Sequence, residues 1–127
     1  MRLTKYISLD AHSHFNRILN VYEGDFETLQ VAAGAVRHDV KGVRCGDGWI
    51  AMYEAASDSA NPEEDGDMYF AVIQNDAQFV EDLCGHMVAL SGIRNGEAVE
   101  YLAGSGWSGA GIGSLDEWCA IVEREAA

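Results

Sequence analysis

The sequence predicts an α+β domain with a mainly antiparallel sheet of about four to five strands and three to four helices packed on it. Three observations lead to this fold class. A glycine-rich turn separates two β-favouring runs at residues 43–53, an uninterrupted apolar run covers residues 68–73, and several other segments space their apolar residues as a helix does. A small α/β layout with some parallel pairing is the alternative. The whole chain, residues 1–127, is predicted to be a single domain.

The elements follow in order along the chain. Residues 2–9 alternate loosely and predict a strand. Phe15, Ile18, Leu19 and Tyr22 predict a helix over about 13–23, and the apolar residues of 26–36 favour a second helix over a strand.

The central part of the chain gives sharper signals. Val43–Cys45 and Trp49–Tyr53 flank Gly46, Asp47 and Gly48, which predicts a hairpin because these turn residues tolerate positive φ angles. Residues 68–73 are the strongest predicted strand. Residues 54–67 are polar and acidic, and they predict a long exposed loop between the two strands.

The last third of the chain predicts a helix, a strand and a helix. Apolar residues trace one helical face over about 76–90, and residues 98–102 favour a strand. Residues 104–113 predict a glycine-rich loop, and Ser114 with Glu117 forms a capping box that opens the final helix.

The charge distribution is the most unusual property of the sequence. The formal net charge is −13, with 21 acidic against 8 basic residues. No Lys or Arg occurs between Cys45 and Ile93, so acids of one sign dominate the middle of the chain. The ten acidic residues of this segment are Asp47, Glu54, Asp58, Glu63, Glu64, Asp65, Asp67, Asp76, Glu81 and Asp82.

Three interpretations of these acids compete: a solvated surface that keeps the protein in solution, recognition of a basic partner, and binding of a divalent metal. Recognition predicts a non-enzymatic inhibitor of a basic nucleic-acid-handling protein, of the anti-CRISPR, anti-restriction or toxin-immunity type. Its carboxylates would occupy a groove that otherwise binds phosphates, with Trp107 as an aromatic anchor. Direct binding to nucleic acid is disfavoured because phosphates would be repelled.

The alternative function is a small metal- or nucleotide-dependent enzyme. His12 and His14 are two residues apart and form the candidate metal pair, with Asp10, Cys84 or His86 as possible further ligands. The glycine-rich segment 104–113 satisfies G-x-G-x-x-G, but Asp116 and Glu117 would repel a phosphate there. The sequence therefore predicts no cofactor and no metal.

The cysteines and the N-terminal residues indicate the cellular compartment. Cys45, Cys84 and Cys119 are odd in number and widely spaced, which favours reduced thiols over a disulfide framework. Neither a secretory signal nor a membrane span is apparent, so we expect a cytoplasmic protein. The sequence carries no signal for the oligomeric state.

Overall fold

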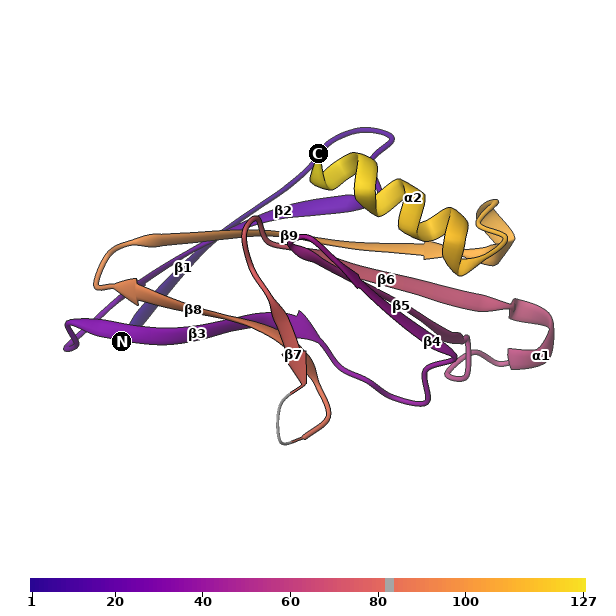
Figure 1. Cartoon of the computed structure of the whole chain (residues 1–127), viewed down its shortest axis with the longest axis horizontal. Coiled ribbons are helices and arrows are strands. Elements are labelled where there is room, and N and C mark those ends of the chain that lie inside the picture. Colours follow the sequence, from indigo (N-terminus) through magenta and orange to yellow (C-terminus); the bar gives the residue numbers. More distant parts are fainter. Residues whose placement is uncertain (82–83) are drawn as a thin grey trace.

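The computed structural model describes residues 1–81 and 84–127, and within them it is dominated by antiparallel β-structure (Figure 1). The strands are β1 (Arg2–Leu9), β2 (Phe15–Glu23), β3 (Thr28–Ala35), β4 (Gly42–Gly46), β5 (Trp49–Ala55), β6 (Asp67–Ile73), β7 (Phe79–Glu81), β8 (Met87–Arg94) and β9 (Ala98–Trp107). The helical elements are α1 (Pro62–Asp65), the 3-10 turn η1 (Ser108–Ala110) and α2 (Leu115–Ala126).

The strands form two sheets, and every strand pair between described residues is antiparallel. The large sheet has the order β1-β2-β9-β6-β5-β4, and the small sheet has the order β3-β8-β7. Figure 1 shows α2 on one face of the large sheet and the small sheet on the other. The described residues therefore form three layers, helix on sheet on sheet, with one long helix.

The predicted α+β class with three to four helices is wrong, and so is the α/β alternative with parallel pairing. Residues 13–23 and 26–36, predicted as helices, contain β2 and β3. The helix predicted over 76–90 is replaced by β7 and the start of β8, with residues 82 and 83 outside the described part of the chain.

The physical reason lies in the three-layer architecture. Strands of the large sheet that are covered on both faces carry apolar residues on both, so their sequences lose the clean alternation of a half-exposed strand. In β2, Phe15 packs in the core under α2, whereas Ile18 points to the opposite face. The resulting spacing of apolar residues imitates a helical period.

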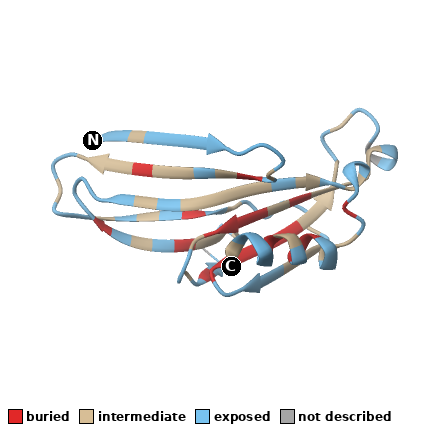
Figure 2. Cartoon of the chain, turned by 90° about the horizontal axis from the view of Figure 1, so that it is seen from above, coloured by how far each residue is buried: buried red, intermediate tan, exposed pale blue. Residues whose placement is uncertain are grey.

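Two apolar cores hold the layers together. Along β5, Trp49 and Ala51 pack towards α2, while Ile50 and Met52 pack towards the small sheet. Residues 50–52 are at most 1% exposed, as expected for a strand sandwiched between two layers. Figure 2 shows this buried band in the middle of the molecule and the exposed strand β1 at its margin.

Several local predictions are confirmed. β4 and β5 form the predicted hairpin, with Gly46 opposite Trp49 and Gly48 at a φ of +71°. β6 covers the predicted strand at 68–73, and α2 begins at the predicted capping box. The Ser114 hydroxyl accepts a hydrogen bond from the Glu117 backbone N–H at 3.1 Å.

Candidate interaction site

Six of the predicted partner-binding acids lie together where β5 ends and β6 begins. The connection between these strands closes on itself, because the Ala56 N–H donates to the Gly66 carbonyl at 2.9 Å. We call this region the acidic end. Its carboxylates belong to Glu54, Asp58, Glu63, Glu64, Asp65 and Asp67.

The connection in the acidic end is largely exposed and joins two neighbouring strands, as predicted, and it contains one short helix. Its centre is the short helix α1, and contacts from the far end of β9 hold that helix in place. The Trp107 indole N–H donates to the Asp65 carbonyl oxygen, and the Asp67 N–H donates to the Ser108 hydroxyl at 2.9 Å. The carboxylates of α1 are therefore presented from a fixed backbone.

Gly66 makes this docking possible. Its φ is +76°, a conformation that side chains with a Cβ rarely adopt. A Cβ at this position would also lie 2.1 Å from the Ser108 Oγ. A glycine therefore allows the chain to leave α1 and enter β6 directly beside Ser108.

Few cations neutralise the acidic end. Lys41 Nζ donates to Asp67 Oδ1 at 2.6 Å, and this hydrogen bond raises the pKa of Lys41 above its usual value. His38 Nδ1 lies 3.4 Å from Glu54 Oε1. Within residues 1–81 and 84–127, the remaining four carboxylates of the acidic end have no ion pair, so the field there stays strongly negative.

Trp107 lies in the same region and is 43% exposed. One side of its ring rests on Gly109, where an added Cβ would come within 2.4 Å of the ring, and its N–H is engaged by α1. The sequence left open whether this indole is packed or exposed. The structure fixes its orientation and leaves a large part of its apolar surface accessible beside the carboxylates.

The other predicted partner-binding acids lie elsewhere. Asp47 and Asp76 line a pocket at the opposite end of β5 and β6. Glu81 lies on β7 and forms an ion pair with Arg37 at 3.4 Å. Asp82 lies outside the described residues. The described acids of residues 47–81 are thus divided between separate regions and do not share one face.

The glycine-rich segment does not form the predicted loop. Residues 104–107 continue β9, and residues 108–110 form η1. A Cβ on Gly104 would lie 2.4 Å from the Phe15 ring, and one on Gly106 would lie 2.2 Å from Ile112. The absence of a side chain at these glycines lets Phe15 and Ile112 pack directly against β9. The space where a phosphate would bind is therefore occupied by core side chains.

Among the histidines and cysteines, His14 and Cys119 pack against the core, whereas Cys45 and Cys84 are exposed. His12 and His14 line one pocket with Asp10, but within the described chain no group of three or more His, Cys, Asp or Glu residues could hold a metal ion. His14 instead contacts the Trp118 ring edge-on at 5.7 Å between centroids. Burial raises the pKa of Cys119, which disfavours a reactive thiolate.

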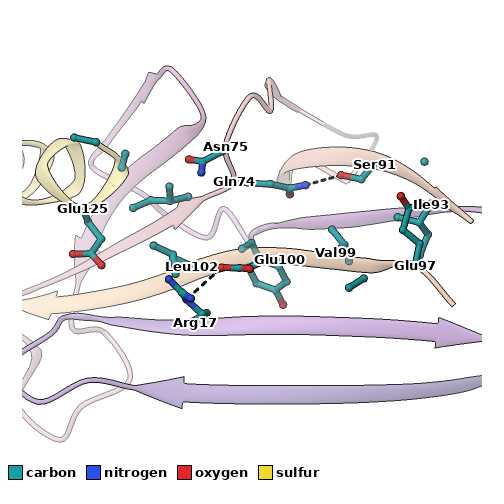
Figure 3. Close-up of a pocket in the computed structure, with 16 residues that line it drawn as sticks. Arg17, Gln74, Asn75, Ser91, Ile93, Glu97, Val99, Glu100, Leu102 and Glu125 are labelled. Carbon is teal, nitrogen blue, oxygen red and sulfur yellow. Dashed lines mark hydrogen bonds and ion pairs between the residues drawn. The ribbon is translucent and has the colours of Figure 1, made fainter.

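One pocket was not predicted from the sequence. It has a volume of about 600 Å³. It lies at the C-terminal end of β6, between β9, β8 and the end of α2 (Figure 3). Arg17 pairs with Glu100 at 3.3 Å, and Gln74 Nε2 donates to Ser91 Oγ at 2.6 Å. These four residues come from three strands and a turn, so no local motif marks them. The Ser91 hydroxyl accepts its hydrogen bond from the Gln74 side-chain amide.

A family model for a domain of unknown function, DUF4861, matches residues 1–127. The chain belongs to this family. No curated protein and no solved structure matches the DUF4861 chain. Among its described residues, no helix has the length and apolar composition that a membrane crossing requires.

Proposed function

We propose that this DUF4861 domain is a non-enzymatic binding protein that uses its acidic end to inhibit a basic, nucleic-acid-handling protein in the cytoplasm. One observation carries the proposal. Four carboxylates that form no ion pair among the described residues lie on the same surface as the half-exposed Trp107. The partner classes are an RNA-guided nuclease, a restriction enzyme and a nuclease toxin.

Electrostatics supports a cationic partner. Six carboxylates and one lysine leave the acidic end with a local net charge of −5, counting His38 as neutral. Surfaces that bind nucleic acid present Lys and Arg, and a negative surface that meets them accelerates encounter and releases counterions. A carboxylate surface also repels nucleic acid, so the partner is a protein.

Preorganisation supports a specific contact over mere solubility. The backbone of α1 is fixed by Trp107 and Ser108, so its carboxylates lose less conformational freedom on binding than those of a mobile tail would. Trp is among the residues most enriched at binding hot spots, and Trp107 lies within this charged surface. The charges can steer a partner while the indole supplies apolar contact.

The test compares two variants that remove the same charge from opposite ends of β5 and β6. Glu63→Gln/Glu64→Gln neutralises two carboxylates of the acidic end, and Asp47→Asn/Asp76→Asn neutralises two at the other end. Asn tolerates the positive φ of Asp76, so the control preserves the backbone. DNA cleavage by a purified RNA-guided nuclease, a restriction endonuclease and a basic nuclease toxin is measured with each variant.

We expect the wild-type protein and the Asp47→Asn/Asp76→Asn control to inhibit at least one of the three enzymes. The Glu63→Gln/Glu64→Gln variant should inhibit that enzyme about tenfold less, and inhibition should weaken as salt rises from about 50 to 500 mM. The proposal is overturned if none of the enzymes is inhibited. It is also overturned if the two variants lose inhibition equally.

A further inference from the structure

Strand β1 forms an open edge of the large sheet. It pairs with β2 along its whole length, from Arg2 opposite Glu23 to Leu9 opposite Asn16. No described strand pairs with its other side, which therefore presents a row of free backbone N–H and C=O groups. Figure 2 shows β1 as a long, almost fully exposed strand at the margin of the molecule.

Apart from Arg2 and Lys5, the edge lacks the usual protection against strand pairing. Natural edge strands are shortened, bulged, interrupted by proline or heavily charged. β1 is eight residues long, pairs with β2 without a bulge, and contains neither proline nor glycine. Large apolar side chains that are 46–63% exposed occur along it, namely Leu3, Tyr6, Ile7 and Leu9.

The charge near this edge favours a second copy of the same chain as the molecule that binds it. Residues 1–23 carry three basic and two acidic residues, a net charge of +1, whereas the whole chain carries −13. Two copies of so acidic a protein repel each other over most of their surfaces. They approach with the least repulsion when both present β1, which contains Arg2 and Lys5 and no acid.

The sequence of β1 is also complementary to itself. Two identical antiparallel strands can be related by a two-fold axis perpendicular to the sheet. The residue numbers of each opposing pair then add up to the same even number. An axis through Tyr6 places Tyr6 opposite its own copy, Leu3 opposite Leu9, and Lys5 opposite Ile7. The same register places Thr4 opposite Ser8 and Arg2 opposite Asp10, so no like charges face each other.

We propose that two copies of this chain associate through β1 in that register, which joins their large sheets into one continuous sheet. Backbone hydrogen bonds supply the contact, and the apolar pairs fix the register. The acidic ends lie at β5 and β6, away from β1 in the strand order, so a dimer presents two of them. This interface is independent of the proposed inhibitory function.

The test uses paired charge substitutions at neighbouring exposed positions. Tyr6→Glu places two carboxylates opposite each other at the axis, whereas Ile7→Glu places each carboxylate opposite Lys5 of the other copy. Both variants change the net charge by the same amount. Sedimentation equilibrium from about 1 µM to 1 mM gives the dimer dissociation constant, and circular dichroism checks the fold of each variant.

We expect a concentration-dependent dimer of the wild-type chain, dimerisation weakened at least about fivefold by Tyr6→Glu, and dimerisation retained by Ile7→Glu. Asp10→Lys provides a second variant, at an exposed position just beyond the strand, and it should also weaken the dimer by facing Arg2. A wild-type chain that stays monomeric up to 1 mM overturns the proposal. Equal effects of Tyr6→Glu and Ile7→Glu overturn it as well, because the register would then be wrong. No partner protein is present, so this outcome is separate from that of the inhibition assay.

Discussion

The indole N–H of Trp118 in α2 donates a 2.9 Å hydrogen bond to the backbone carbonyl oxygen of Phe70 in β6. Trp118 is fully buried, and its ring stacks on Phe15 of β2 with centroids 5.8 Å apart. One side chain thus joins the only long helix of the described chain to two strands of the large sheet. The layer of α2 on the sheet depends on this contact.

Truncating Trp118 to alanine should therefore cost more stability than an alanine substitution elsewhere in α2. Trp118→Ala should lower the free energy of unfolding by about 3–5 kcal/mol, because it removes a large buried ring. Trp118→Phe should cost about 1–3 kcal/mol, since apolar contact remains but the hydrogen bond is lost. Urea unfolding followed by circular dichroism measures both. Equal stability of Trp118→Ala and the wild type would show that α2 does not anchor the fold.

The small sheet offers a matched pair of glycines. A Cβ on Gly34 in β3 would lie 2.1 Å from the Met87 backbone oxygen and 2.8 Å from the Val88 Cα, so β3 and β8 would have to separate. A Cβ on Gly92 in β8 would meet no heavy atom within 4 Å. Gly34→Ala should destabilise the protein by about 1–3 kcal/mol, and Gly92→Ala should change stability by less than about 1 kcal/mol. The same urea titration distinguishes them, and a reversed order would contradict this packing.

The start of α2 depends on a reciprocal cap. Ser114 Oγ accepts from the Glu117 N–H, and Glu117 Oε2 accepts from the Gly113 N–H at 2.7 Å. Ser114→Ala should lower the unfolding free energy by about 1 kcal/mol, because one helix N–H loses its partner. Ser114→Asp preserves the acceptor and should keep most of the stability. If both variants were equally destabilised in thermal melts, the hydroxyl would not act as a cap.

Stability should fall at alkaline pH. Burial raises the pKa of Tyr69 above its usual 10.0 and the pKa of Cys119 above its usual 9.0, and the hydrogen bond to Asp67 raises the pKa of Lys41 above 10.5. A raised pKa means that the folded state retains a proton that the unfolded state releases. The stabilisation is complete below these usual values and is lost as pH rises through the folded-state pKa values.

Urea unfolding at intervals from pH 7 to 11 tests this dependence. The free energy of unfolding should be flat near pH 7 and should decline from about pH 9 upwards. Tyr69→Phe keeps the buried ring and removes one titrating group, so its decline should be shallower. A wild-type stability that rises between pH 9 and 11 would contradict the direction of these shifts.

The sequence predicted those parts of the fold that depend on neighbouring residues. Turn residues around Asp47 specified the hairpin, and Ser114 with Glu117 specified the start of α2, because both signals act within a few residues. The helices predicted over 13–23 and 26–36 failed for the opposite reason. The apolar residues of 13–23 are divided between the two faces of β2, whereas β3 buries one face only. A local pattern contains no information about which layers will be present.

The acidic end likewise has a part that the sequence predicted and a part that it could not predict. Glu63, Glu64 and Asp65 are close in space because they are neighbours in the sequence, so composition alone revealed an acidic segment. The sequence could not place Trp107 beside them. That contact exists because β9 pairs with β6 and brings Met68 opposite Trp107.

By itself, the sequence determined the charge of this protein, its sharpest turn and the cap of its last helix, since each depends on residues only a few positions apart. Tertiary structure alone decided that ambiguous apolar segments become strands and that the described acids of residues 47–81 are divided between the two ends of β5 and β6 and strand β7. It also decided that β1 is left as an unpaired edge. These outcomes depend on pairing between distant strands, which outweighs local helical preference.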